Sequence, residues 1–211
     1  MTLYSYIVRF DTGFAPNPFF GYCTLACCKA GIRKAAKAKD WIIGLTPRAQ
    51  GKGNKIVYFM QVDETLTFDA YWRDPRFKEK RPNLHGGPVE KNGDNIYKPS
   101  RQHSLGYLQL PSDHSDQHCK MRENAGSKEK DLGGGRLLVS RRFAYFGSNA
   151  MDLPKELKAL RVERNYRCQF SAKVKEDFLH FAKKQKVGAY EAPRHWPKDD
   201  HTWKVAASGK V

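Results

Sequence analysis

Two prolines inside an aromatic-rich segment constrain the fold of this chain more than any other local feature. Residues 14–22 read Phe-Ala-Pro-Asn-Pro-Phe-Phe-Gly-Tyr, and Pro16 and Pro18 exclude a regular helix because each lacks an amide hydrogen and restricts the residue before it. The alternating apolar residues before this loop predict a strand over residues 4–10, with Tyr4, Tyr6, Val8 and Phe10 on one face. The chain therefore begins with a strand that leads into an irregular aromatic loop.

The next segments predict a helix and a hairpin. Apolar residues recur at helical spacing after the loop, at Cys28, Ile32, Ala35 and Ala36. Residues 40–44 and 55–62 read as buried strands, and the glycines and proline of the linker 46–54 favour a hairpin.

The second half of the chain mixes both element types. We expect a short helix over 67–72, a strand over 136–146, and helices over 154–160 and 172–185. In the last helix, Val174, Phe178 and Phe181 form a stripe that is typical of core packing.

These elements lack the regular alternation of a doubly wound sheet and predict an α+β fold with a mixed β-sheet. We expect a single domain over residues 1–187, with a long irregular insertion over about 78–135, because that stretch is polar and rich in glycine. Residues 188–211 read as a loosely ordered tail.

The charge indicates the class of partner. Thirty-eight Lys and Arg residues against 22 Asp and Glu residues give a net charge of +16, spread along the chain rather than along one amphipathic helix. Such a field favours nucleic acid, DNA above all, or a nucleotide over a membrane. The alternative is a basic, soluble protein without a polyanionic partner.

Cysteine usage favours a reducing compartment. The five cysteines are odd in number and include the adjacent pair Cys27–Cys28, and the start of the chain does not resemble a signal peptide, so we expect a cytoplasmic location. The segment 113–119 contains His114, His118 and Cys119, but its spacing matches no zinc pattern, so we expect no metal. We also expect no cofactor, because nucleotide-binding glycine motifs are absent. The sequence does not single out a Cys–His nucleophile pair among so many thiols and histidines.

The aromatic loop followed by a basic segment predicts a site for a base. Aromatic rings stack on bases, amide and carboxylate side chains read base edges, and Lys or Arg hold phosphates. The candidate base pocket consists of Asn17, Phe19, Phe20, Tyr22, Trp41, Asp94 and Asn95. The candidate phosphate contacts are Lys29, Arg33, Lys34, Arg76, Lys78, Lys80 and Arg81. The alternatives are that the aromatics are core and that residues 93–97 form an ordinary turn.

Several of these segments together resemble a known family. The block Leu3–Ala26, the segment 40–44, the segment 68–77 and Gly93-Asp-Asn-Ile-Tyr97 resemble the second nucleotide-modification-associated domain family, found in bacteria and phages near DNA-base modification systems. The resemblance extends to about residue 150 and implies a role in that context.

A weaker resemblance is to the PUA-like and EVE-like domains, small β-barrels with helices that read flipped modified bases. It lies in the order strand, loop, helix and Asp40-Trp-Ile-Ile-Gly44, although Lys39 replaces the glycine that often precedes the aspartate in those folds. It implies a small barrel as an alternative to an open mixed sheet.

The leading hypothesis is a module that recognises a modified base or nucleotide. An enzyme that acts on nucleotides or DNA bases is the alternative, with Asp11, Asp94 and His114 as candidate acid–base groups. Action through a protein partner is a third possibility.

Overall fold

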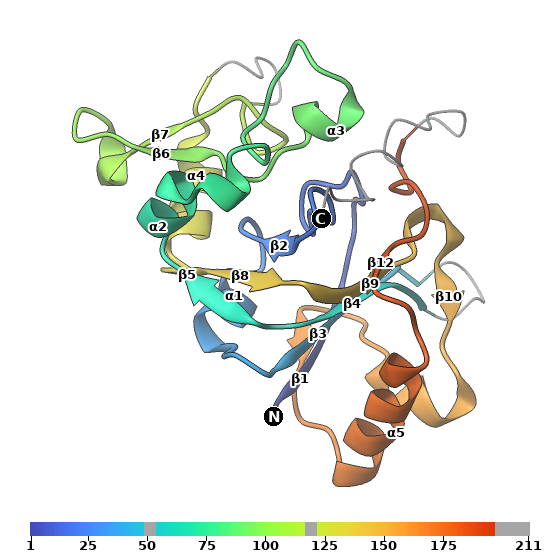
Figure 1. Ribbon diagram of the computed structural model, residues 1–211. Coiled ribbons are helices and arrows are strands. Elements are labelled where there is room, and N and C mark those ends of the chain that lie inside the picture. The colour runs from blue at the N-terminus through green and yellow to red at the C-terminus, as the bar shows by residue number, and fades with distance from the viewer. Residues whose placement is uncertain (49–53, 117–121, 197–211) are drawn as a thin grey trace.

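A computed structural model describes residues 1–48, 54–116 and 122–196. Its centre is a seven-stranded mixed sheet in which β1 (Leu3–Ile7) lies parallel to β3 (Trp41–Leu45), as Figure 1 shows. The strand β4 (Lys55–Gln61) runs antiparallel to both of its neighbours, β3 and β9 (Arg142–Tyr145). Short strands complete the edges: β11 (Tyr166–Arg167), β12 (Gly188–Ala189) and β10 (Met151–Asp152). The hairpin expected from residues 40–62 is confirmed.

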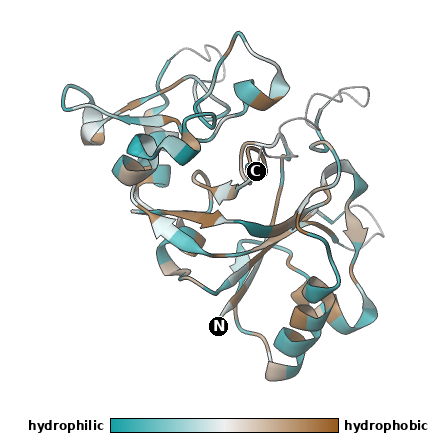
Figure 2. Ribbon diagram, in the orientation of Figure 1, coloured by the Kyte–Doolittle hydropathy of each residue, from teal (hydrophilic) through white to brown (hydrophobic). Residues whose placement is uncertain are grey.

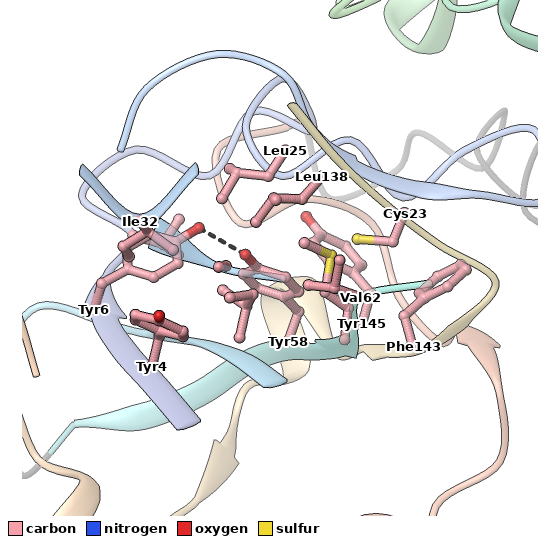
Figure 3. Close-up of a cluster of buried hydrophobic side chains, with 14 of the residues drawn as sticks. Tyr4, Tyr6, Cys23, Leu25, Ile32, Tyr58, Val62, Leu138, Phe143 and Tyr145 are labelled. Carbon is pink, nitrogen blue, oxygen red and sulfur yellow. Dashed lines mark hydrogen bonds between the residues drawn. The ribbon is translucent and has the colours of Figure 1, made fainter. Parts of the chain in front are cut away.

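Apolar side chains cover both faces of this sheet, since alternate residues of a strand point to opposite faces. One face carries Tyr4, Tyr6 and Tyr58, and the Tyr6 and Tyr58 hydroxyls form a hydrogen bond of 2.8 Å inside the cluster (Figure 3). The other face packs against α5 (Ala172–Lys183) and the 3₁₀ helix η4 (Lys155–Leu160). Phe178 is fully buried there, which confirms that the stripe of α5 is core.

A second, three-stranded sheet joins β2 (Cys23–Leu25), β8 (Leu137–Ser140) and β5 (Glu64–Leu66). Only Arg141 separates β8 from β9, so the strand expected over 136–146 passes from one sheet into the other. In the part of the chain that the structure describes, the sheets stay open and form no closed barrel. The fold is α+β, as the sequence predicts.

The stretch expected to be an irregular insertion packs on an apolar cluster that it shares with residues from outside it, such as Phe68 and Leu137, and it lies above the central sheet in Figure 1. Figure 2 shows that its outer ribbon is mostly hydrophilic, while the strands of the central sheet carry brown, hydrophobic segments. Phe68, Tyr71, Phe77 and Tyr97 are the buried centre of the cluster. Two elements precede this stretch, α2 (Phe68–Arg73) and η1 (Pro75–Phe77). The stretch itself contains α3 (Pro88–Lys91), β6 (Tyr97–Pro99), η2 (Ser104–Gly106), β7 (Tyr107–Gln109) and α4 (Ala125–Leu132).

Three expectations need correction. The first strand ends at Ile7, and Phe10 does not join the core face but is 69% exposed. The helix expected from Cys28 is the six-residue α1 (Ala30–Ala35), and the helix expected at 154–160 is the 3₁₀ helix η4.

The tail expected from residue 188 is packed as far as residue 196. β12 pairs with β9, Ala192 is buried, and the amide of Ser148, in the 3₁₀ helix η3 (Gly147–Asn149), donates to the Ala192 carbonyl. Residues 197–211 lie outside the described residues. No helix among the described residues is long and apolar enough to span a membrane.

Candidate active site

A cavity of about 890 Å³ opens between the end of β1, the turn that follows β2 and one side of α4. Its wall includes Phe10, Phe14, Cys28, Lys29, His114 and Asp131. Of the four cysteines that the structure describes, only Cys28 lines it. The thiol of Cys28 is thus accessible to a small molecule in this cavity.

Cys28 lies on a sharp turn between β2 and α1. Cys28 and Lys29 both have positive φ angles, 59° and 42°, a conformation that costs about 1–3 kcal/mol for a residue with a side chain. Two hydrogen bonds fix the turn: the Cys28 amide donates to Asp131 Oδ1 at 2.7 Å, and Arg33 Nε donates to the Cys28 carbonyl at 2.7 Å. A strained strand–turn–helix connection that presents a nucleophile is known in hydrolases.

His114 lies between Cys28 and Asp131. Its Nε2 is 3.1 Å from Cys28 Sγ, and its Nδ1 is 2.6 Å from Asp131 Oδ2. The edge of the Phe14 ring packs on the imidazole, with the ring centroids 4.9 Å apart. We call these three residues the Cys28–His114–Asp131 triad, because a nucleophile, a base and a group that orients the base are aligned by hydrogen bonds.

The charge state of His114 follows from these neighbours. Burial by itself lowers the pKa of His114, but the hydrogen bonds to Asp131 and Cys28 outweigh burial and raise the pKa to about 10. The imidazolium therefore predominates at neutral pH and can donate to both partners.

Asp131 is held from several sides. Its carboxylate accepts from the Tyr97 hydroxyl at 2.8 Å and from the Cys28 amide. Its main-chain carbonyl accepts from Arg33 Nη2 at 2.6 Å, and the guanidinium lies 3.7 Å from its carboxylate. The Arg33 guanidinium is fully buried and also donates to the Arg136 carbonyl at 2.6 Å. Arg33 thereby joins the backbone of Cys28 to that of Asp131.

The same region offers a possible set of metal ligands. Ligand atoms of Cys27, His114 and Asp131 lie within 4.8 Å of one another. Burial raises the pKa of the Cys27 thiol well above its usual range, and this thiol donates to the Asp94 carbonyl at 3.7 Å. His114 and Asp131 are members of both groups, which differ in whether Cys27 or Cys28 supplies the sulfur. His118 and Cys119 lie outside the described residues.

The expected base pocket does not line this cavity. Asn17, Phe19, Trp41, Asp94 and Asn95 are almost fully buried. Phe19 stacks on Trp196 with ring centroids 5.6 Å apart, and Trp41 packs on Phe59 and Phe178 in the core on one face of the main sheet. Those rings have protein neighbours where a base would lie.

The polar members of that set are engaged inside the protein. Asp94 accepts from the Thr24 hydroxyl at 2.6 Å and from the Tyr71 hydroxyl at 2.7 Å. Asn95 donates to two main-chain carbonyls, those of Tyr71 and Phe77. Phe20 and Tyr22 are half-buried and also lie outside the cavity wall.

The expected phosphate contacts separate into three groups. Arg33 and Lys80 are fully buried, and Lys80 Nζ donates to the carbonyls of Asn17 and Tyr22, so neither is available to a phosphate. Lys34, Arg76 and Lys78 are exposed, and Arg81 lies over the Trp72 ring at 3.9 Å. Lys29 alone among these seven lines the cavity.

One member of the triad was among the candidates that the sequence offered. His114 is one of the acid–base candidates that it offered, whereas Asp11 and Asp94 are buried outside the triad. Asp131 was not identified at all. No local pattern could have found it, because Cys28 is 86 residues from His114 and 103 from Asp131.

Comparison with known proteins gives one match. The model of the family described as nucleotide modification associated domain 2 matches residues 1–200. No curated protein and no solved structure matches the chain. Since the match covers nearly the whole sequence, the chain belongs to the nucleotide modification associated domain 2 family.

Proposed function

We propose that this protein is an enzyme of nucleotide modification that uses Cys28 as a nucleophile. The observation that carries the proposal is the alignment of Cys28 Sγ, the His114 ring and the Asp131 carboxylate at 3.1 and 2.6 Å on a cavity wall. The family supplies the chemical context, since it is associated with nucleotide modification.

The geometry suits transfer of a group through a covalent intermediate. The Cys28 thiolate attacks an electrophilic carbon of the substrate and forms a carbon–sulfur bond, while the bond to the leaving group breaks. The His114 Nε2–H protonates the departing group. Neutral His114 then takes a proton from water or from an acceptor nucleophile, which attacks the same carbon and releases the Cys28 thiolate. Asp131 keeps the imidazole oriented through both steps.

A second candidate is recognition of a modified base without chemistry. It draws support from the net charge of +16 and from exposed cations such as Lys34 and Lys78, which lie outside the cavity. Such a protein binds DNA through phosphates and needs no reactive thiol. The two candidates therefore differ in whether Cys28 is activated.

The rate of alkylation of Cys28 by iodoacetamide at pH 7 tests the enzyme directly. An ordinary thiol is only a few per cent ionised at this pH. A thiol held as thiolate by an imidazolium should react on the order of 10-fold faster. We expect His114→Gln and Asp131→Asn to remove this acceleration. Peptide mapping separates Cys28 from Cys168, which is half-buried outside the cavity and serves as the internal reference.

Lys34→Gln is the matched control, because Lys34 is an exposed residue of the same helix, α1, that follows Cys28. It should leave the rate at Cys28 unchanged. If Cys28 reacts no faster than Cys168, and His114→Gln does not slow it, the triad is not a nucleophilic site and base recognition becomes the better account.

A further inference from the structure

The cavity carries an aromatic ring that the core does not use. Phe10 follows β1 and would join Tyr6 and Val8 in the core if the strand continued, but its ring is 69% exposed and lines the cavity. Exposing a phenylalanine is unfavourable, by about 1.5–3 kcal/mol relative to full burial. An exposed ring on a concave wall is therefore available to stack with a planar ligand.

A second ring lies beside it. His195 comes from the far end of the described chain, and its ring centroid is 5.8 Å from that of Phe10, with the planes tilted by 58°. The Asp11 amide donates to His195 Nδ1 at 3.0 Å, and the His195 amide donates to the Asp11 carbonyl at 3.1 Å. These two bonds fix His195 next to Phe10.

This part of the wall is anchored to the core. The Asp11 carboxylate accepts from the Tyr145 hydroxyl at 2.5 Å and from the Arg194 amide at 3.1 Å. The Trp196 indole donates to the Thr12 carbonyl at 2.7 Å. A segment 183 to 184 residues away in sequence is thus held in place on the cavity wall, so the pair of rings is preorganised.

The charge of the cavity wall favours an anion. Arg9, Lys29 and Lys130 line it, and Lys29 is half-buried, with its Nζ 4.9 Å from the centroid of the Tyr6 ring. The two acids on the wall already have partners: Asp131 belongs to the triad, and Asp113 accepts from the Thr12 hydroxyl at 2.6 Å. Cations of this kind attract a phosphate group.

We infer that this cavity binds a nucleoside phosphate, with its base against Phe10 and His195 and its phosphate near Lys29 and Arg9. The volume of about 890 Å³ lies within the range of about 300–1,000 Å³ of small-molecule sites. The role of this ligand as a substrate rests on the proposed function, but its binding can be tested separately from the reaction. The nucleoside phosphate could be a free nucleotide or one unit of a DNA strand.

Calorimetric titration of the full chain carrying Cys28→Ser tests binding without chemistry. The probes are thymidine 5′-monophosphate, thymidine, inorganic phosphate and single-stranded (dT)8. We expect Phe10→Ala to weaken the affinity for thymidine monophosphate about 5-fold to 150-fold, because one stacked base contributes about 1–3 kcal/mol. Phe10→Tyr should retain the affinity, and Lys29→Gln should weaken the monophosphate but not thymidine. Val187→Ala removes an apolar residue exposed outside the cavity and is the matched control.

A second measurement locates the ligand. In the wild-type chain, thymidine monophosphate at a concentration near its dissociation constant should slow the alkylation of Cys28 by iodoacetamide, and Phe10→Ala should remove most of this protection at the same concentration. Protection by the monophosphate alone indicates a free nucleotide as ligand, whereas stronger protection by (dT)8 indicates a strand.

Two results would overturn the inference: no binding of either nucleotide probe at millimolar concentration, or binding that Phe10→Ala leaves unchanged. If inorganic phosphate bound as tightly as thymidine monophosphate, the two rings would have no role in binding. Because fast alkylation of Cys28 depends on the triad and not on a nucleotide, a reactive Cys28 without nucleotide binding rejects this inference and leaves the proposed function standing. Nucleotide binding by a protein whose Cys28 is alkylated at the rate of an ordinary thiol rejects the proposed function and leaves this inference standing.

Discussion

Replacing Arg33 by methionine should destabilise the fold and disable Cys28 together. The substitution retains most of the aliphatic length but removes a guanidinium that is fully buried. The carbonyls of Cys28, Asp131 and Arg136, which accept its hydrogen bonds at 2.6 to 2.7 Å, would lose their donor. Asp131 would also lose the cation that lies 3.7 Å from its carboxylate.

The magnitude follows from these contacts. Hydrogen bonds to a charged group contribute about 1.5–3 kcal/mol each, but removing the guanidinium also relieves the cost of burying its charge. Breaking a buried charged pair on one side typically costs about 3–5 kcal/mol, and we expect a loss of that size in the free energy of unfolding. Urea denaturation followed by tryptophan fluorescence measures this loss of unfolding free energy. Iodoacetamide should alkylate Cys28 more slowly in the folded variant than in the wild type.

Two further variants sharpen this test. In Gly134→Ala the new Cβ would lie 2.5 Å from Arg33 Nη1 and 2.7 Å from its Cζ, so the guanidinium would have to move, and stability should fall in the same direction. Lys34→Met alters an exposed neighbour and should change stability by less than about 0.5 kcal/mol. If Arg33→Met is as stable as Lys34→Met, Arg33 does not hold the site together. A phosphate contact would instead lower the salt slope of DNA binding by about 1 at unchanged stability.

Four other measurements follow from the structure. The pKa of His114 is raised from 6.5 to about 10 in the folded chain, so the stability that this group contributes is complete below about pH 6.5 and is lost as the pH rises to 10. Over that range, urea denaturation should show that the wild type loses at least about 1.4 kcal/mol of unfolding free energy relative to His114→Gln. Parallel pH profiles of the two proteins would contradict this. Phe19→Ala should cost about 3–5 kcal/mol of unfolding free energy, because the ring is fully buried; a loss below 1 kcal/mol would mean that the ring is not core. Treatment with EDTA should leave the melting temperature unchanged, and a drop accompanied by released zinc would show that Cys27, His114 and Asp131 hold a metal. Binding to duplex DNA, if it occurs through the exposed cations, should weaken with salt with a log–log slope of about 0.9 per phosphate contact, and a flat dependence would exclude that mode.

Local patterns were sufficient for most of the elements. The alternation at Tyr4 and Tyr6 and the apolar runs of β3 and β4 predicted neighbouring strands, because the two-residue period of a strand is visible in sequence. The stripe through Phe178 predicted a core-facing helix for the same kind of reason. The helices and strands within residues 78–135 were not visible in the sequence, because the apolar residues that anchor this stretch, such as Ile96 and Tyr97, are few and show no period.

The site required the tertiary structure. Sequence composition determined that the chain is strongly basic, and the order of the predicted elements indicated an α+β fold. The blocks around residues 3–26 and 93–97 indicated the family, whose model matches residues 1–200. Those blocks contain Asn17, Phe19 and Asp94, and a single sequence cannot distinguish a ring or amide that binds a ligand from one that is buried in the protein. The triad joins Cys28, His114 and Asp131 across about 100 residues, and only the packing of α4 and the loop before it against the β2–α1 turn brings a nucleophile, a base and an orienting carboxylate within hydrogen-bonding distance.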